Sequence, residues 1–407
     1  MRTLRPQRLG ASDADDAEDA DSYISPVKRV AGWLRPAWVE VDLAAVTANV
    51  AHIAEVVAPS AVCAVVKADG YGHGAVPVAR AAIAGGATHL GVALAEEGHE
   101  LREAGVDVPV IVLSEPAPQA MRLVVRDKLT PTIYTERGLA ALLGVVATQD
   151  GGTPVPVHLK VDTGMHRVGA SPAQVLELAR AVAANPALSL EGLYTHLAVA
   201  DEPADPYTQE QLATFDRVIA ALAADGIRPP LLHAANSAGA LVHPASRYQI
   251  VRPGIAIYGL APASSMRSHP AVRALLPALA FKAEVSYSKE VAAGEGLSYG
   301  LHYRLPASSD IATVPVGYAD GVPRRLSQVG GEVLIGGRRR PIAGSVTMDQ
   351  ILVDCGPGSG VKAGDEVVLI GCQGDEEITA WDWGERLRTI AYEVTCALSA
   401  RLPRIYT

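Results

Sequence analysis

AVCAVVKADGYGHGA, residues 61–75, is an apolar segment that ends in Lys67 and runs directly into a loop with three glycines. Its β-branched valines favour extended backbone, and its glycines permit turns that other residues resist. An alanine-rich stretch with helical spacing of its apolar residues, Pro77–Ala84, follows the loop. The segment therefore predicts one strand–loop–helix unit of an α/β fold, with a lysine at the carboxyl end of its strand.

Lys67 is the chemically informative residue of this unit. An ammonium group is costly to bury, so a lysine that closes an apolar strand usually has a chemical role. Desolvation favours its neutral amine, the form that bonds to a carbonyl cofactor. The glycines let the backbone approach a ligand, and Tyr71 offers a hydroxyl to a phosphate. The segment indicates a lysine that binds pyridoxal phosphate; the alternative is a lysine that reaches solvent before an ordinary turn.

The same alternation continues along the chain. Leaving aside a first strand at 38–43, eight apolar segments alternate with helical stretches such as Pro172–Ala184. Eight strands with crossover helices predict a (β/α)8 barrel of the TIM type. A doubly wound open sheet is the competing architecture, but its GxGxxG phosphate loop is not found in the expected place. The strands are expected near 61–67, 89–94, 109–114, 130–134, 155–161, 190–196, 230–236 and 248–252.

The pattern changes after about residue 265. Short apolar segments separated by Gly, Pro and Asp turns predict a mostly β domain. We expect the strand at 38–43 to join this domain, because the barrel is complete without it. The predicted organisation is a disordered acidic tail at 1–32, a cofactor-binding barrel at 45–264, and a β-rich C-terminal domain made of 33–44 plus 265–407. Its strands are expected at 283–291, 311–316, 332–335 and 366–370.

Composition and charge argue against several classes of function. The net charge is -9 and no extended basic stripe is present, so nucleic acid is not an expected partner. No apolar run is long enough to span a membrane, and no apolar segment follows the acidic residues 11–21 as a secretory signal would require. Four cysteines without CxxC spacing indicate isolated thiols in a reducing compartment and no metal site. A cytoplasmic location is expected.

Polar or ionisable residues follow five of the eight predicted strands. In a barrel these strand ends meet at one rim, so we expect the residues to face a common site. Ser237 and the backbone N–H groups of Gly254 and Ile255 are suited to hold a phosphate, while His196 and Arg252 face a ring. The residues singled out are Lys67, Lys160, Arg167, His196, His233, Asn236, Ser237, Arg252, Gly254 and Ile255.

Each of these residues also has an ordinary explanation. His196 suits a hydrogen-bonded core histidine, and Arg252 suits a pair with a surface acid. Asn236 and Ser237 suit the N-cap of a helix without any ligand. We favour the joint interpretation because the residues share one predicted rim.

Motifs along residues 33–407 resemble those of bacterial alanine racemase, a family of fold-type III pyridoxal phosphate enzymes. The resemblance implies a homodimer with shared active sites that interconverts L-alanine and D-alanine and supplies D-alanine for peptidoglycan. The motifs, in the order of the family, are Lys67-Ala68-Asp69-Gly70-Tyr71-Gly72-His73-Gly74, Lys160-Val161-Asp162-Thr163-Gly164-Met165, Tyr194-Thr195-His196, Asn236-Ser237, Arg252-Pro253-Gly254, Ser298-Tyr299-Gly300, Gly317-Tyr318-Ala319-Asp320-Gly321 and Met348-Asp349-Gln350.

The resemblance implies two acid/base residues. Lys67, bonded to the cofactor, acts on one face of the substrate, and Tyr299 of the other subunit acts on the opposite face. Inversion at a planar carbon needs proton removal and delivery on opposite sides. His196 is implied to contact Tyr299 and to be backed by Arg252, which addresses the pyridine nitrogen. An arginine does not give up its proton, so the ring is a weaker electron sink, which favours reprotonation over decarboxylation.

The remaining roles rest on the same resemblance. Arg167 and the backbone at Met348 would hold the substrate carboxylate. Lys160 matches a position that is carbamylated in many members, which would give an anion that orients Arg167; the alternative is a salt bridge to Asp162. The cofactor contacts implied are Lys67, Tyr71, His196, Asn236, Ser237, Arg252, Gly254 and Ile255, and the supporting residues are His233, Tyr318 and Asp349.

The chain departs from the family pattern at Ala400, where some members carry a tyrosine that reaches the phosphate. The smaller side chain predicts looser phosphate binding or room for a substrate larger than alanine, such as serine. The acidic tail at 1–32 also lies outside the pattern.

Two other classes of function stay open at this point. A related barrel enzyme that decarboxylates a basic amino acid would lack the motif at 160–165 and would not present Tyr299. A non-catalytic carrier of pyridoxal phosphate would need neither Tyr299 nor the residues after the barrel.

Overall fold

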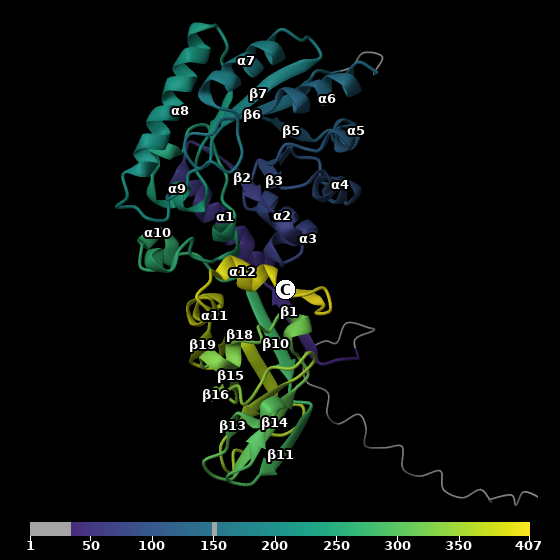
Figure 1. The fold of residues 1–407 in the computed structure, drawn as a ribbon, viewed down its shortest axis with the longest axis vertical. Helices are drawn as coiled ribbons and strands as arrows, with labels where there is room; N and C mark the ends of the chain where they lie inside the picture. The colour runs from purple at the N-terminus through teal and green to yellow at the C-terminus, as the bar shows by residue number, and fades with distance from the viewer. Residues whose placement is uncertain (1–33, 149–152) are drawn as a thin grey trace, which may run out of the picture.

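Two lobes make up the chain in the computed structural model, which describes residues 34–148 and 153–407 (Figure 1). The upper lobe in this view mixes helices and strands, and the lower lobe is mostly β. Residues 1–32, predicted as an acidic tail, lie outside the described residues. Within the described residues, no helix combines the length and the apolar character that a membrane crossing requires.

The upper lobe is a barrel of eight parallel strands in the order β8-β7-β6-β5-β4-β3-β2-β9. Its end strands meet through backbone hydrogen bonds from Gln249 to Leu232 at 3.1 Å and from Arg252 to Ala235 at 2.9 Å. The predicted (β/α)8 barrel is confirmed, and an open doubly wound sheet is excluded. The strands are β2 (Ala61–Val65), β3 (His89–Val92), β4 (Val110–Val112), β5 (Thr130–Ile133), β6 (Val155–Lys160), β7 (Leu188–Tyr194), β8 (Leu231–His233) and β9 (Ile250–Val251).

Helices surround the barrel, and several begin at a side chain that caps them. Asp42 caps α1, Thr135 caps α6, and Ser171 caps α7. The last strand is followed only by the short 3-10 helix η3 (Ile255–Tyr258), and α1, which precedes the first barrel strand, packs against α3, α9 and η3 to complete the ring. The helices are α1 (Leu43–Val57), α3 (Ala75–Ala84), α4 (Ala95–Glu103), α5 (Met121–Arg126), α6 (Glu136–Val146), α7 (Pro172–Ala183), α8 (Tyr207–Ala224) and α9 (Ser237–Val242).

The lower lobe is built on a sheet in the order β16-β15-β18-β10-β1-β20, and β19 pairs with β18. Strand β1, which precedes the barrel, runs antiparallel to β10 and parallel to β20. The domain boundaries drawn from the sequence stay predictions. The elements are β1 (Ala37–Val41), β10 (Leu279–Glu284), β11 (Tyr287–Val291), β12 (Gly296–Leu297), β13 (Tyr303–Arg304), β14 (Ser309–Val314), β15 (Glu332–Ile335), β16 (Arg338–Pro341), β17 (Ile351–Asp354), β18 (Glu366–Gln373), β19 (Glu376–Ile378), β20 (Arg404–Tyr406), and the helices α10 (Pro270–Arg273), α11 (Ala380–Leu387) and α12 (Ala391–Cys396).

The segment predicted as one strand at 283–291 is broken in the structure. Strand β10 ends at Glu284, and β11 begins at Tyr287 in a separate three-stranded sheet with β14 and β17. Between them, Val285 donates its backbone N–H to Asp365 and Ser286 donates to Thr313. The chain changes sheets here because consecutive N–H groups pair with different strands, which the apolar pattern alone does not reveal.

A buried asparagine ties the barrel to the segment that leaves it. Asn49 on α1 is 1% exposed. Its Oδ1 accepts from Leu276 N at 2.7 Å, and its Nδ2 donates to Leu276 O at 2.8 Å and to Ile257 O at 3.2 Å. Nearby, Gly259 has a φ of +80°, and a Cβ at this position would lie 1.8 Å from Leu276 O. The path between the lobes is therefore specified by one amide side chain and one glycine.

Replacing Asn49 with leucine should lower the free energy of unfolding by about 3 kcal/mol, because it leaves buried backbone groups of residues 257 and 276 without partners. Urea titrations followed by circular dichroism measure this quantity. Glu55→Gln, at an exposed position of the same helix, is the control and should change it by less than about 0.5 kcal/mol. Equal stabilities for Asn49→Leu and wild type would contradict the role given to this amide.

Candidate active site

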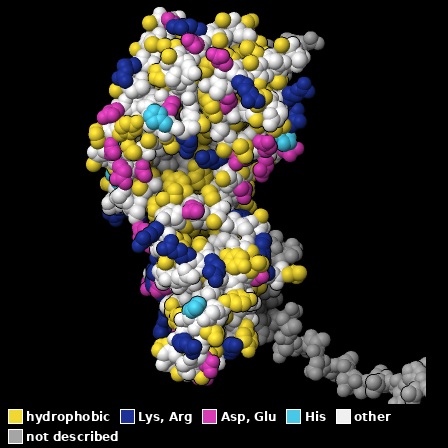
Figure 2. Space-filling view, in the orientation of Figure 1, with side chains coloured by type: hydrophobic (Ala, Val, Ile, Leu, Met, Phe, Trp, Pro, Cys, Tyr) yellow, Lys and Arg dark blue, Asp and Glu magenta, His cyan; other side chains and the backbone are white. Residues whose placement is uncertain are grey.

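A cavity of about 610 Å³, which we call the rim cavity, opens at the carboxyl ends of the barrel strands. Figure 2 shows hydrophobic side chains gathered where the two lobes meet. Nine of the ten residues singled out at the predicted rim line the cavity, as does Tyr71, whereas His233 is buried and does not line it. The lining residues are Val65, Lys67, Ala68, Tyr71, Ala93, Leu113, Ser114, Lys160, Arg167, Val168, Tyr194, His196, Asn236, Ser237, Arg252, Gly254, Ile255, Tyr392 and Cys396.

A left-handed turn holds Lys67 at the rim. Lys67 opens the short helix α2 (Lys67–Tyr71), and the backbone φ angles of the residues that follow it are 52° at Ala68, 51° at Asp69, 59° at Gly70 and 53° at Tyr71. Left-handed backbone costs roughly 1–2 kcal/mol for each residue that carries a Cβ. Such strain persists only where surrounding contacts impose it, and it concentrates at functional sites.

Several contacts impose this turn. Glu97 accepts the N–H of Ala68 at 2.7 Å through one carboxylate oxygen and that of Ala93 at 2.7 Å through the other, which joins the ends of β2 and β3. Arg404, from the last strand of the chain, donates to the carbonyl of Gly72 at 3.0 Å. The backbone around Lys67 is therefore held from the barrel and from the C-terminal segment.

The rim cavity carries an excess of positive charge. Lys67, Lys160, Arg167 and Arg252 line it, and no acidic side chain of the described residues does. Burial, and then Arg167, lower the pKa of Lys67. Burial, and then Arg252, Arg167 and Lys67, lower the pKa of Lys160 to about 7. This electrostatic environment suits a ligand with negative charge.

Lys160 forms no ion pair with Asp162 in the described part of the chain. The carboxylate of Asp162 instead accepts from the backbone N–H of Gly164 at 2.9 Å and pairs with the exposed ring of His166 at 3.0 Å. The ammonium of Lys160 lies 5.3 Å from the centre of the Tyr194 ring. The salt bridge considered for Lys160 is therefore not formed, and the cations Arg252, Arg167 and Lys67 affect the pKa of Lys160 more than Asp162 does.

Arg252 lies buried beneath the rim cavity, 4% exposed. It donates to Nδ1 of His233 at 2.7 Å, to the carbonyl of Thr195 at 2.8 Å and to Nδ1 of His196 at 3.3 Å. Its guanidinium also lies 4.9 Å from the centre of the Tyr194 ring. Within the described residues it has no carboxylate partner, so the suggested pair with a surface acid is wrong. Arg252 is a fixed cation whose acceptors are neutral.

The residues predicted to hold a phosphate form a cradle. Ser237 Oγ accepts the N–H groups of Gly254 at 2.9 Å and Ala256 at 3.3 Å, which leaves its hydroxyl proton to donate elsewhere. A Cβ at position 254 would lie 2.3 Å from the hydroxyl oxygen of Tyr71, so the glycine makes room for that hydroxyl. Asn236 caps α9 by accepting from Gly239 N at 2.9 Å, as its ordinary explanation suggested, and it also lines the rim cavity.

Tyr299, Tyr318 and Met348 lie on the lower lobe and do not line the rim cavity of their own chain. Together with Leu301 they form an exposed surface that we call the tyrosine face, with exposed fractions of 75% for Tyr299 and 52% for Met348. Backbone contacts join the loops that carry it: Tyr299 O accepts from Ser345 Oγ at 3.0 Å, and Tyr318 N donates to Thr347 O at 2.9 Å.

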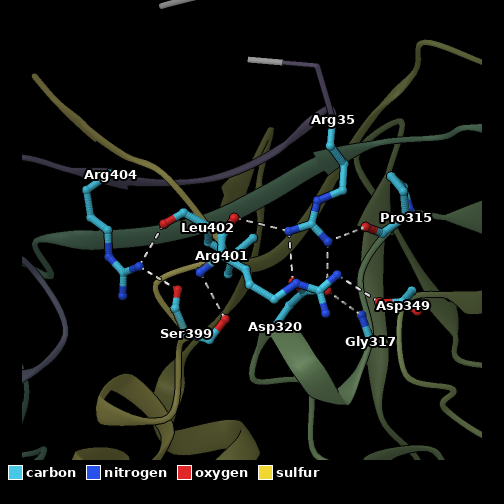
Figure 3. Close-up of polar contacts among 9 residues, drawn as sticks. All are labelled: Arg35, Pro315, Gly317, Asp320, Asp349, Ser399, Arg401, Leu402 and Arg404. Carbon is cyan, nitrogen blue, oxygen red and sulfur yellow. Dashed lines mark hydrogen bonds and ion pairs between the residues drawn. The ribbon is translucent and has the colours of Figure 1, made fainter. Parts of the chain in front are cut away.

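An ion-pair network supports the loops of the tyrosine face (Figure 3). The buried Asp320 accepts two hydrogen bonds from Arg35 at 2.8 and 2.9 Å and one from the backbone of Gly317 at 3.0 Å. Arg401 donates to Asp349, next to Met348, at 2.7 Å. Asp349 therefore supports its loop. The segment 399–404 joins that loop to Gly72 through Arg404.

Sequence reasoning missed several residues of the rim cavity, among them two side chains from a distant part of the chain. Tyr392 and Cys396 come from α12, which the chain reaches only after the β sheets of the lower lobe. No local pattern marks them, because their position depends on how α12 packs against α2. Tyr194 was part of a motif but was given no role, although its hydroxyl donates to Leu113 O at 2.8 Å and its ring lies against Arg252. Ala400 is exposed and does not line the cavity.

Comparisons with known proteins agree with this architecture. The family model for the alanine racemase N-terminal domain matches residues 41–262, and the model for the alanine racemase C-terminal domain matches residues 278–406. The alanine racemase of Symbiobacterium thermophilum is 47% identical over 376 residues, which cover 92% of this chain and 97% of that protein. The alanine racemase of a Nostoc species is 41% identical over 371 residues, with 91% and 95% covered.

Solved structures show the same relationship. The crystal structure of alanine racemase from E. faecalis superposes with a TM-score of 0.87 at 42% identity and covers 93% of this chain and 100% of that chain. The enzyme from D-cycloserine-producing Streptomyces lavendulae gives a TM-score of 0.86 at 37% identity, with 92% and 98% covered. These matches span both lobes, which the carrier alternative does not explain, because a carrier would not need the residues after the barrel. The chain therefore belongs to the alanine racemase family and is an isomerase.

Proposed function

We propose that this enzyme interconverts L-alanine and D-alanine with pyridoxal phosphate bound in the rim cavity. The relatives named above are alanine racemases. The observation that carries the proposal is Lys67, an amine of lowered pKa at the end of a barrel strand, in a cavity lined by cations and by a hydroxyl cradle. In the cell, the enzyme would work in the cytoplasm and would supply D-alanine for peptidoglycan.

Pyridoxal phosphate fits the side chains of the rim cavity. The hydroxyls of Tyr71 and Ser237 and the N–H of Ile255 would hold its phosphate, Arg252 would donate to its ring nitrogen, and Lys67 would bond to its carbonyl carbon. When bound, the cofactor withdraws electrons from the α-carbon of an attached amino acid and so acidifies the α-proton. The excess of positive charge in the cavity is what a phosphate and a substrate carboxylate together would balance.

Arg252 would set how strongly electrons are withdrawn. A guanidinium only donates hydrogen bonds and keeps its proton at any physiological pH. Its contacts with His233, Thr195 and His196 leave it no freedom to swing away. It would therefore hold the ring nitrogen without protonating it, and a proton taken from the α-carbon would return quickly. This favours racemisation over decarboxylation.

Lys67 would move the proton on one face of the α-carbon. Burial and Arg167 lower its pKa, so a free amine is available as a base nearer neutral pH than for an exposed lysine. The opposite face needs a second acid, and Tyr299 of the partner subunit is the proposed donor. His196, held by Arg252 at Nδ1, would present its Nε2–H to that phenol oxygen and favour its charged form.

The tyrosine face supports a homodimer with shared sites. It gathers Tyr299, Leu301, Tyr318 and Met348 on joined loops, and all four are exposed in a single chain. Aromatic and methionine side chains clustered on a surface are typical of protein interfaces. We propose that this face closes the rim cavity of a second copy, which brings Tyr299 and the backbone of Met348 to the substrate.

Arg167 and Lys160 would define the substrate carboxylate site. Arg167 is exposed at the mouth of the rim cavity and has no acidic partner in the described residues. Because the pKa of Lys160 is lowered to about 7, a neutral amine is available to react with carbon dioxide. Its nitrogen would bond to the carbon of carbon dioxide and release one proton to solvent. The resulting carbamate is an anion that would orient Arg167 and relieve the repulsion among the cations. Whether Ala400 widens the substrate range to serine stays a prediction.

Lys67→Ala should lower the rate of D-alanine formation by at least about 10³-fold, because the base and the cofactor attachment are lost together. Chiral chromatography of the product measures the rate. Borohydride reduction of wild type followed by peptide mapping should label Lys67. Lys362→Ala, at an exposed position, is the control. An unchanged rate in Lys67→Ala would remove the assignment.

Tyr299→Phe should lower racemisation by about 100-fold or more while cofactor and dimer remain. If sites are shared, mixing Lys67→Ala with Tyr299→Phe subunits should restore about a quarter of the wild-type rate, because half of the dimers are mixed and each mixed dimer has one intact site. The rate after subunit exchange measures this. No recovery in dimers shown to be mixed would contradict shared sites, and loss of cofactor in Tyr299→Phe would make it a binding residue.

Lys160→Met should stabilise the cofactor-free protein in buffer without carbon dioxide. The folded pKa of Lys160, about 7, lies below the unfolded value, so the charged form opposes folding. This penalty is full below about pH 7 and fades as pH rises toward about 10.5. The gain should therefore be as much as about 3 kcal/mol at pH 6 and near zero at pH 10, measured by urea unfolding. A gain independent of pH would contradict the lowered pKa.

A further inference from the structure

A chain of buried polar side chains runs through the barrel from Arg252 toward its opposite end. Arg252 donates to His233 Nδ1 at 2.7 Å, and His233 Nε2 lies 2.9 Å from His158 Nδ1. His158 Nε2 lies 3.2 Å from a carboxylate oxygen of Glu191. Glu191 also lines a groove that contains Pro109 and Thr130, at the amino ends of strands β4 and β5. We call these four side chains, Arg252, His233, His158 and Glu191, the relay. It starts below the rim cavity and ends at the far face of the barrel.

Only one arrangement of protons satisfies this relay. The guanidinium of Arg252 can only donate, so His233 must accept at Nδ1 and carry its own proton on Nε2. That proton points at His158 Nδ1, so His158 carries its proton on Nε2 and donates it to Glu191. A carboxylate can only accept, which agrees with the direction set at the other end. A donor-only group and an acceptor-only group thus fix both tautomers.

The relay is built into the barrel packing. Both histidines are 0% exposed, and burial lowers the pKa of each, so they are neutral near pH 7. A Cβ at Gly192 would lie 2.5 Å from the ring of His158, so the glycine makes room for the imidazole. The ring of Tyr194 stacks on that of His233 with 4.5 Å between their centres and 9° between their planes. Neither ring has space to turn without disturbing a neighbour.

We propose that Glu191 and His158 are positioning residues that act through His233 to hold the guanidinium of Arg252 in register with the rim cavity. If the proton of His233 were on Nδ1, this N–H would face an N–H of Arg252. The repulsion between these two donors would push Arg252 away. Arg252 also donates to Nδ1 of His196, so the proton of His196 lies on Nε2 as well. The inference deepens the proposed function and rests on it for its kinetic consequence.

The test removes the acceptor-only end. In cofactor-free protein labelled with 15N at histidine, two-bond 15N–1H spectra identify the protonated nitrogen of each ring. Wild type should show His158 and His233 both protonated at Nε2. Glu191→Leu should show the Nδ1–H tautomer of His158 in part of the molecules, because its Nε2–H then has no acceptor. That tautomer opposes the Nε2–H of His233, which Arg252 requires. Glu191→Gln keeps an acceptor oxygen and should stay close to wild type, which also guards against a leucine variant that does not fold.

The control is Asp127→Asn, which alters another carboxylate of the same groove. Asp127 accepts from the ring of His99 at 2.8 Å, and within the described residues it contacts none of His233, His158 and Glu191. It should leave the spectra of His158 and His233 unchanged. Thermal unfolding of both variants shows whether any effect is a general loss of stability.

A displaced Arg252 should affect the rate of the reaction more than the binding of the substrate. In Glu191→Leu, kcat should fall about 10-fold while the KM for alanine changes less than about twofold, because the relay contacts no group that holds the substrate carboxylate. Unchanged tautomers, or altered tautomers with wild-type kcat, would overturn the inference. If wild type does not racemise alanine, the proposed function fails, while the spectra of cofactor-free protein still decide whether Glu191 fixes the tautomers.

Discussion

The chemistry of the rim cavity depends on a buried arginine whose acceptors carry no charge. A carboxylate beside Arg252 would neutralise it and would compete with a ligand for its N–H groups. Histidine rings and a backbone carbonyl instead fix its direction and leave its charge available. Burying a cation in this way is costly unless its donors are satisfied. The barrel meets that condition with side chains from neighbouring strands.

The same charge organises the rest of the cavity. It contributes to lowering the pKa of Lys160 and His196, and Arg167 acts in the same direction on Lys67. No acidic side chain of the described residues lines the rim cavity, so an anionic occupant would balance its positive charge. Neutral lysines and an anionic ligand are two responses to one electrostatic constraint.

The C-terminal segment links the strained turn to the tyrosine face. Arg404 binds the carbonyl of Gly72. Arg401 binds Asp349 (Figure 3), which precedes Gln350 and follows Met348 in the chain. A turn of left-handed residues does not hold itself, because each non-glycine residue would relax to ordinary backbone. The last strand of the chain supplies part of the restraint, and Glu97 of the barrel supplies another part. The lower lobe therefore shapes the cavity above it as well as the surface that we propose for a second copy.

The sequence by itself determined the barrel and most of the residues at its rim, because strand periodicity is local and parallel strands bring their carboxyl ends together. Only the tertiary structure decided the break between β10 and β11, the packing of α12 with Tyr392 and Cys396, and the absence of a Lys160–Asp162 pair. The relay through His158 and Glu191 was equally hidden. These features depend on contacts between residues far apart in the chain, and no local pattern records which distant group will satisfy a buried donor.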